Sequence, residues 1–187
     1  RALPEGSLVA LDWAQNRLTL KAGKSRFNLQ TLPAEDFPLM SIGEDVSAAF
    51  SLPQEAFKNM LSQVQYSMAV QDIRYYLNGL LMQVEGDQLR LVATDGHRLA
   101  FGSAELGAEV PRQEVILPRK TVLELQRLLS DSDEPISLQF APNQAKFSFG
   151  GMEFVTKLVE GKFPDYNRVI PKNHKNSVTL GRAPLLA

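Results

Sequence analysis

The stretch Thr94-Asp95-Gly96-His97-Arg98-Leu99 decides how the middle of this chain can fold. Before it, residues 75–84 have the aromatic and aliphatic content of a buried strand, and residues 89–94 alternate like a strand that returns beside it. Glu85-Gly86-Asp87-Gln88, between these two runs, has the composition of a turn. We therefore expect a hairpin that ends at the Asp-Gly pair, where a reversal with positive φ presents an imidazole and a guanidinium side by side.

The residues that catalysis or metal binding would need are scarce. The chain has no cysteine and two histidines, His97 and His174, and it lacks a nucleophile elbow, an HExxH motif, a phosphate-binding glycine loop and EF-hand spacing. One pair, Asp95 with His97, suits general acid–base chemistry because the two side chains can hydrogen-bond across the glycine between them. No nucleophile or cofactor motif accompanies that pair. The sequence therefore predicts a protein that is not an enzyme and has no cofactor or metal site.

Four motifs, in a fixed order along the chain, identify a family. They are QDIRYYLNG at residues 71–79, ATDGHRLA at 93–100, PRK at 118–120 and KLVEGKFPDY at 157–166. This set closely resembles the bacterial replicative sliding clamps, the DNA polymerase III beta subunit family, and the resemblance extends from the first residue to the last. It implies a processivity factor that forms a ring around duplex DNA without sequence preference and recruits replication and repair proteins.

Composition sets the outer bounds. The 187 residues, of which 44% are hydrophobic and 22% charged, are ordinary globular material, enough for one domain and part of another. A formal net charge of -1 argues against a polycation that coats nucleic acid, although a basic face balanced by an acidic one remains compatible with it. The absence of cysteine excludes disulfides and thiolate metal sites. No apolar run approaches the roughly 20 residues that span a bilayer, so we expect a cytoplasmic protein without a membrane contact.

Periodicity outlines the secondary structure. Three short antiparallel strands are expected before residue 31, and a strand ending at Leu52 is expected to lead into a helix that begins at Pro53. A second helix is expected from Pro118 to Leu129, after a strand at residues 113–117. Each helix has an apolar stripe at three- and four-residue spacing, which is typical of a helix packed on a sheet.

The opening pattern returns later in the chain. Val9, Leu11 and Trp13 alternate as Ile136, Leu138 and Phe140 do, a spacing of 127 residues, and Phe37-Pro38 recurs at Phe163-Pro164 with a spacing of 126. An internal repeat is the simplest account. The entry into the first helix, a strand followed by a proline-started helix, recurs from Ser177 onward. We therefore expect a fragment of a longer protein: the end of a first domain (1–46), a complete second domain (47–172), and a linker with the start of a third domain (173–187).

The predicted fold class is α+β, because each complete repeat should hold about eight short strands and two helices that pack on antiparallel sheet. The resemblance implies the DNA-clamp fold. In that fold a subunit has three such domains, and two subunits form a homodimeric ring with sheets outside and helices lining the hole.

Two sets of residues are candidates for DNA contact. A helix that faces the phosphate backbone should have a basic or amide polar face, as the second predicted helix does, although an ordinary solvated helix face would look the same. An amide, a cation and two phenols before the middle strand could bind a backbone or stack on bases, although one of two adjacent tyrosines on a strand would point into the core. The resemblance implies that Gln71, Tyr75 and Tyr76 touch DNA leaving the ring. The complete candidate set is Gln71, Arg74, Tyr75, Tyr76, Arg119 and Lys120.

A third set has the composition of a peptide-binding groove, with an apolar floor and a cationic rim. Taken singly, each member is explained by packing or by a solvated charge. The resemblance implies that together they form the pocket for short linear motifs of the polymerase III alpha subunit, the clamp loader and repair proteins, and that the third domain supplies part of it. The set comprises Leu77, Thr94, Gly96, His97, Arg98, Leu99, Pro164, Arg168 and Val169.

Two alternatives to a sliding clamp follow from the residues alone. The first is an enzyme that uses Asp95 and His97, and the second is a structural protein-interaction module with no DNA role, which the modest basic charge permits. An activity screen separates the first from a clamp, and salt-dependent retention on DNA separates the second.

Overall fold

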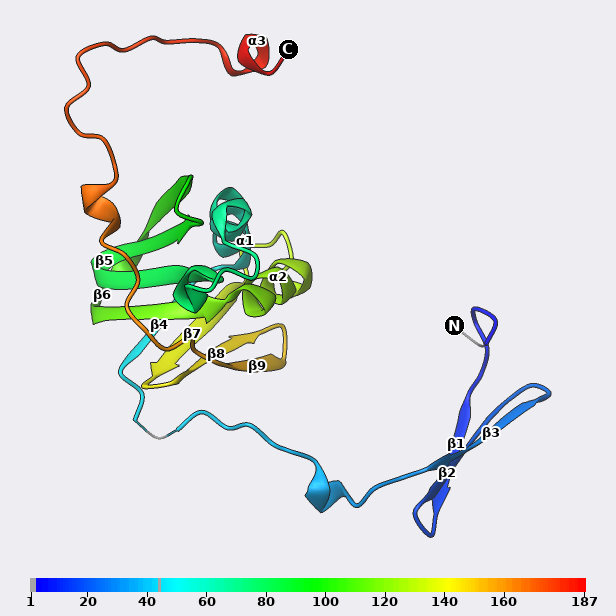
Figure 1. Ribbon diagram of the computed structural model, residues 1–187. Helices are drawn as coiled ribbons and strands as arrows, with labels where there is room; N and C mark the ends of the chain where they lie inside the picture. Colours follow the sequence, from blue (N-terminus) through cyan, green and yellow to red (C-terminus); the bar gives the residue numbers. More distant parts are fainter. Residues whose placement is uncertain (1–2, 44) are drawn as a thin grey trace. The chain divides into compact units, whose positions relative to one another are not determined.

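A computed structural model describes residues 3–43 and 45–187 (Figure 1). The chain divides into two compact units, Arg1–Ser41 and Ile42–Ala187, and each is described by itself. No helix among the described residues is long and apolar enough to cross a membrane.

The first unit is a three-stranded antiparallel sheet in the order β1-β2-β3, followed by a short 3-10 helix, η1 (Ala34–Asp36). Its strands are β1 (Ala10–Ala14), β2 (Arg17–Ala22) and β3 (Ser25–Gln30). Leu20 pairs with Leu11 on one side and with Phe27 on the other, so the apolar residues share one face. That face is open to solvent, and Trp13 on it is 65% exposed.

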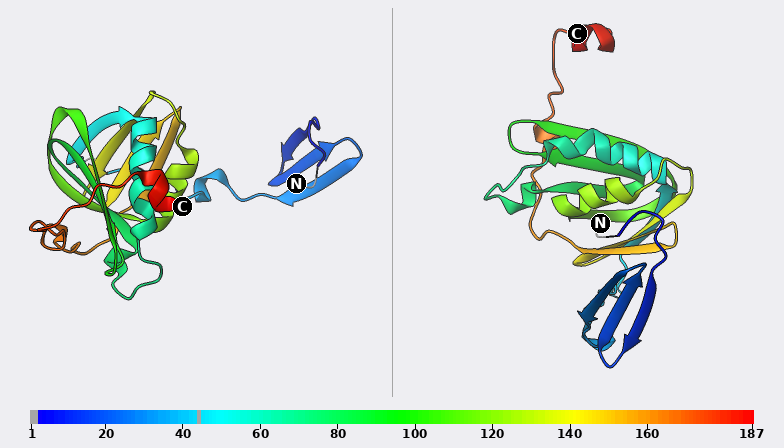
Figure 2. Two further views of the ribbon diagram at one scale, coloured as in Figure 1. Left: turned by 90° about the horizontal axis from the view of Figure 1, so that it is seen from above. Right: turned by 90° about the vertical axis from the view of Figure 1, so that its right-hand side faces the viewer.

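Among its described residues, the second unit contains two antiparallel sheets and three α-helices, two of which pack on the sheets. One sheet has the order β4-β7-β8-β9, and the other is the long hairpin β5-β6. The strands are β4 (Ala48–Pro53), β5 (Gly79–Thr94), β6 (Leu99–Pro118), β7 (Pro135–Ala141), β8 (Gln144–Phe149) and β9 (Met152–Lys157). The helices α1 (Gln54–Val64) and α2 (Arg119–Leu128) lie side by side and pack on both sheets, as Figure 2 shows from two directions.

Prolines set where both helices begin. Pro53 and Pro118 hold extended backbone with ψ of 140° and 144°, and each is followed directly by the first helical residue. Because proline has no N–H to leave unpaired, this position costs little. The stripe of α1 then packs into the core, where Phe57 stacks on Phe147 with ring centroids 6.3 Å apart. Both predicted helices are therefore confirmed: α1 begins one residue after Pro53, and α2 lies within one residue of the predicted limits at both ends.

Strand β5 is buried on both faces. Leu80 and Met82 point into the core that the helices cover, whereas Leu81 points to the opposite face, in a second cluster with Phe163 and Tyr166. Successive side chains of a strand alternate between its faces, so one strand serves both clusters. The second cluster contains Ala69, Leu77, Leu81, Val92, Ile116, Phe163 and Tyr166, with Tyr76, Leu99, Val159 and Ile170 packed against it.

The strand registers confirm the internal repeat. Leu11 pairs with Leu20 as Leu138 pairs with Phe147, and both partners are displaced by 127 residues. The same displacement relates every pair of β1, β2 and β3 to a pair of β7, β8 and β9. The two three-stranded sheets thus have one topology and one register.

The predicted turn at residues 85–88 is wrong. Residues 79–84 pair with 113–118 rather than with 89–94, and residues 89–94 pair with 99–104. Gly86, with φ of 61°, sits between two shifts of register, so the glycine forms a bulge within one continuous strand. The observed strand also begins later than predicted, at Gly79 instead of residue 75, because Tyr75–Leu77 is a 3-10 helix, η3. The reversal after Thr94 is where the sequence predicts it.

The predicted start of a third repeat appears in part. The helix α3 (Arg182–Leu186) forms, but residues 177–180 form no strand, and no described strand pairs with them. A strand needs a neighbour to satisfy its backbone groups, as β4 finds in β7.

One prediction tests the close approach of β5 and β6. A Cβ on Gly79 would meet the carbonyl oxygen of Leu117 closer than real Cβ contacts occur, so Gly79→Ala must push the strands apart. We expect a loss of about 1–3 kcal/mol of unfolding free energy in urea denaturation. Gly102→Ala in the same sheet is the control, because its nearest neighbour is a side-chain methyl of Val64 at 3.5 Å, and it should change stability by under about 1 kcal/mol. Equal effects of the two would contradict the argument.

Candidate functional site

Three segments of the second unit meet around the second cluster. The first is the loop of residues 66–78, which ends in η3 and which we call the tyrosine loop. The second is the reversal between β5 and β6, residues 94–99, called the β5–β6 turn. The third, residues 159–170, crosses the outer face of β5 and β6 and contains the 3-10 helix η4 (Tyr166–Arg168); we call it the exit segment. All nine predicted groove residues lie on these segments.

A single carboxylate organises the β5–β6 turn. Asp95 accepts hydrogen bonds from the backbone N–H groups of His97 (2.9 Å) and Arg98 (3.0 Å) and from Nε of Arg98 (3.0 Å). Thr94 adds a second brace, because its Oγ1 donates to the Arg98 carbonyl at 2.7 Å and accepts from the Gly96 N–H at 3.1 Å. The backbone N–H of Arg98, followed by that of His97, lowers the pKa of Asp95 to about 2. The turn therefore holds the backbone of His97 and Arg98 in one conformation.

Arg74 supports the same turn from the tyrosine loop. Its guanidinium bonds both oxygens of Asp72, at 3.0 and 2.8 Å, and also donates to the Asp95 carbonyl at 3.4 Å. The side-chain hydrogen bond from Arg74 is the main reason that the pKa of Asp72 falls to about 2. Gly96 has φ of 89° and lies against the guanidinium, where a Cβ would sit 3.1 Å from Nη1. A glycine is needed there for both conformation and space.

Arg98 is held in one direction by Tyr66. Its Nη2 donates to the Tyr66 carbonyl at 2.6 Å, and its guanidinium carbon lies 5.5 Å from the centre of the Tyr66 ring. A cation over an aromatic face is attracted by the ring electrons. Arg98 thus lies along the surface beside the turn, while the neighbouring His97 is exposed.

The exit segment exposes apolar and cationic side chains to solvent, while two buried aromatic rings anchor it to the rest of the unit. Phe163 and Tyr166 are buried, whereas Pro164, Arg168 and Val169 between and after them are exposed. Asp165 accepts a hydrogen bond from the Asn167 N–H at 3.2 Å and forms an ion pair with Arg168, whose Nε lies 3.0 Å from Oδ2. Leu99 is half-buried and Leu77 is 1% exposed, so both leucines belong to the packed second cluster rather than to open surface.

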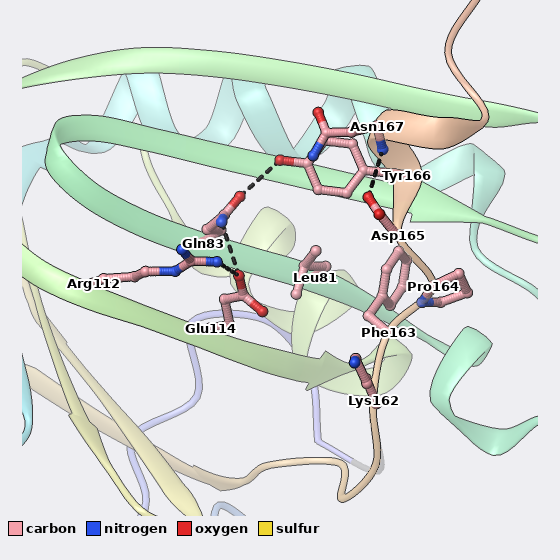
Figure 3. A pocket seen from close by; sticks show the side chains of 10 residues that line it. All are labelled: Leu81, Gln83, Arg112, Glu114, Lys162, Phe163, Pro164, Asp165, Tyr166 and Asn167. Carbon is pink, nitrogen blue, oxygen red and sulfur yellow. Dashed lines mark hydrogen bonds and ion pairs between the residues drawn. The ribbon is translucent and has the colours of Figure 1, made fainter.

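A cavity of about 360 Å³ lies beside the exit segment (Figure 3). Its walls are the outer faces of β5 and β6 and the exit segment from Lys162 to Asn167. Of the nine predicted groove residues, Pro164 alone lines it.

The candidate DNA contacts lie near one another but differ in exposure. Gln71, Tyr75 and Lys120 are exposed, whereas Tyr76 packs against the second cluster, edge-to-face with Tyr75 at 5.8 Å. Arg119, the first residue of α2, donates its backbone N–H to the Asn78 carbonyl and its side chain to the Met68 carbonyl. The start of α2 and the tyrosine loop are therefore joined.

The sequence did not point to several residues that build this site. Asp72, Tyr66 and Gln83 hold or face the predicted residues without belonging to either predicted set. The Asp95 carboxylate binds backbone N–H groups and Arg98, and in this described part of the chain no hydrogen bond joins it to the His97 imidazole as the enzyme alternative would need. An Asp-Gly turn signals that role, since aspartate caps the N–H groups that follow it. The partners of Tyr66 and Gln83 are distant in sequence and leave no local signal.

Comparisons with known proteins agree along nearly the whole chain. Residues 51–165 match the family described as DNA polymerase III beta subunit, central domain, and residues 1–41 match its N-terminal domain. The beta sliding clamp of Escherichia coli K12 is 46% identical over 181 residues, which are 97% of this chain and 49% of that protein.

Solved structures give the same result. The crystal structure of the DNA polymerase III subunit beta from Pseudomonas aeruginosa superposes with a TM-score of 0.85 at 43% identity, covering 93% of this chain and 48% of that one. A sliding clamp of that organism bound to griselimycin gives a TM-score of 0.84 at 44% identity, with 93% and 47% covered. This chain spans about half the length of the relatives that it matches.

The turn predicts a pH dependence. The pKa of Asp95 lies near 2 in the folded chain against an ordinary value of 3.8, so its stabilisation is complete above about pH 4 and is lost as pH falls toward 2. We expect the amide NMR signals of His97 and Arg98 to move in that window. In Asp95→Asn they should stay constant, because the amide oxygen still accepts but does not titrate. Asp72→Asn is the control for the other carboxylate of this region whose pKa lies near 2. Signals of Asp95→Asn that move as in the parent would show another group to be responsible.

Proposed function

Because the chain belongs to the DNA polymerase III beta subunit family, the sliding clamps, we propose that the complete protein is a ring-forming processivity factor of the bacterial replicative polymerase. The observation that carries this is the repeat: two sheets with one register, 127 residues apart, as a ring of similar domains requires. The proposal includes the domain limits 1–46, 47–172 and 173–187, a homodimer of the complete chain, a cytoplasmic location and no catalytic role.

We propose that the helices face duplex DNA with little affinity for it. Lys58 on α1 pairs with Asp131 at 2.8 Å, and Arg127 on α2 pairs with Glu124 at 2.8 Å, so two of the cations on these helices are already neutralised. Each phosphate contact adds to the salt dependence and to the hold on DNA, and a protein that slides needs few of them. The exposed Lys120 and the residues Gln71, Arg74, Tyr75, Tyr76 and Arg119 are the proposed contacts.

The same pairing of charges supports a second candidate, a protein-interaction module with no DNA role. Retention on DNA separates the two. The complete protein should stay on nicked circular DNA after loading and be released when that DNA is cut once, because a closed ring holds it by topology. On linear DNA, binding should be weak, insensitive to sequence, and lost as salt rises from about 50 to 200 mM. Equal retention on circular and linear DNA would favour the interaction module.

We propose that partners bind where the β5–β6 turn faces the exit segment. Leu77 and Leu99 supply an apolar floor, the exposed Pro164 and Val169 an apolar wall, and His97, Arg98 and Arg168 a cationic rim, with Thr94 and Gly96 shaping the backbone between them. Such a groove suits an extended peptide with a glutamine and spaced leucine or phenylalanine residues. Burial of two such side chains yields about 3–6 kcal/mol before ordering costs, which by itself corresponds to dissociation constants from the millimolar to the tens-of-micromolar range, so we expect binding far weaker than nanomolar. The polymerase III alpha subunit, the clamp loader and other motif-bearing proteins are the proposed partners.

Paired variants test the groove in the complete protein. Arg168→Ala should weaken peptide binding about three- to tenfold in calorimetry without lowering stability, because the side chain is exposed. Arg127→Ala is the matched control, since it also breaks an exposed pair three residues apart, on α2 rather than at the groove. Leu99→Asp should abolish binding because it places a charge on the floor. If Arg127→Ala weakened binding as much as Arg168→Ala did, the peptide would have to bind along the helices.

A further inference from the structure

A buried hydrogen bond ties the exit segment to β5. The Tyr166 hydroxyl donates to Oε1 of Gln83 at 2.7 Å, and both residues are only 6% exposed. Figure 3 shows the bond at the edge of the cavity, where it begins a chain that runs through Glu114 to Arg112. The two bonded residues are 83 positions apart, so the bond joins β5 to a segment that follows the last strand.

The orientation of Gln83 is fixed from its other side. Its Nε2 donates to Oε1 of Glu114 at 2.9 Å, directly across the strand pair, and Arg112 donates to that same oxygen at 2.9 Å. A carboxylate accepts and does not donate, so only the amide nitrogen can face Glu114. The amide oxygen therefore faces Tyr166, and the phenol is its hydrogen-bond donor.

The backbone of Tyr166 holds the part of the exit segment that carries the groove residues. Its carbonyl accepts from the N–H groups of Val169 and Ile170, each at 3.1 Å. Residues Lys162–Asn167 border the cavity of about 360 Å³, and within this stretch Phe163 and Tyr166 also pack into the second cluster. The contacts that resist a shift of this stretch are the burial of Phe163 and Tyr166, the packing of the Tyr166 ring on Phe101, and the phenol bond.

We propose that Tyr166 is a positioning residue for the groove, and that its bond to Gln83 is a latch that holds Pro164, Arg168 and Val169 in register with the floor of Leu77 and Leu99. The inference rests on the proposed peptide groove and assigns the specific residue that sets the distance between its two walls. Without the latch, the Gln83 oxygen would be buried without a donor, and the wall would move toward solvent or into the cavity to compensate.

Two variants of the complete protein test the latch against a purely structural role. Tyr166→Phe removes only the hydroxyl and should weaken peptide binding about three- to tenfold. Tyr166→Phe combined with Gln83→Met also removes the unsatisfied amide, so stability in urea should recover while peptide affinity stays low. If affinity returned together with stability, or never fell in Tyr166→Phe, the latch would be refuted.

Hydrogen exchange of backbone amides tests the latch in the absence of any peptide. In Tyr166→Phe the amides of Val169 and Ile170 should exchange at least tenfold faster, because the carbonyl they donate to is no longer held. The amide of Val159, bonded to the Ile116 carbonyl at 2.9 Å, is the internal reference at the other end of the segment and should not change. Unchanged exchange at Val169 and Ile170 would overturn the latch. If the parent protein bound no peptide, the proposed groove would fail, while these exchange rates would still decide the latch.

Discussion

The two-sided burial of β5 is the constraint on which the rest of the second unit depends. Leu80, Met82 and Val84 face the helices, while Leu81 and Gln83 face the exit segment, and all five are buried. A shift of one residue in the pairing with β6 would exchange the two sets and place an amide in the aromatic core. Register is therefore strongly specified, and the helices and the proposed groove are fixed relative to the same strand.

Glycine at position 86 lets one long strand meet that constraint. The β5–β6 ladder changes register on each side of Gly86, so the strand keeps its core-facing residues in step on both halves. The sequence predicted a turn here because a glycine with positive φ suits a turn and a bulge equally. What separates the two is the partner strand, 20 residues long and without a break, and that partner lies far along the chain. Local composition does not contain this information.

Predictions from sequence succeeded where the cause is local and failed where it is not. The helices, the strand before α1 and the reversal after Thr94 follow from periodicity, proline and an Asp-Gly pair, all within a few residues. The role of Arg74 depends on the Asp95 carbonyl, 21 residues away, and that of Arg98 on Tyr66, 32 residues away. The groove set came from resemblance to a family, and the structure adds that Leu77 is buried and Leu99 half-buried while Pro164, Arg168 and Val169 are exposed.

The two walls of the proposed groove are held by unequal means. The β5–β6 turn is braced by Asp95, Thr94 and the Arg74–Asp72 pair, so its backbone has several partners within one short span. The exit segment has two buried rings, one buried hydrogen bond and a cavity at its side. A ligand that needs the walls farther apart would therefore displace the exit segment and leave the turn in place. A segment that is held by fewer interactions costs less free energy to move. Differences in affinity among peptide partners should accordingly arise from contacts with the exit segment, whereas the turn and the floor should contribute similarly to all of them.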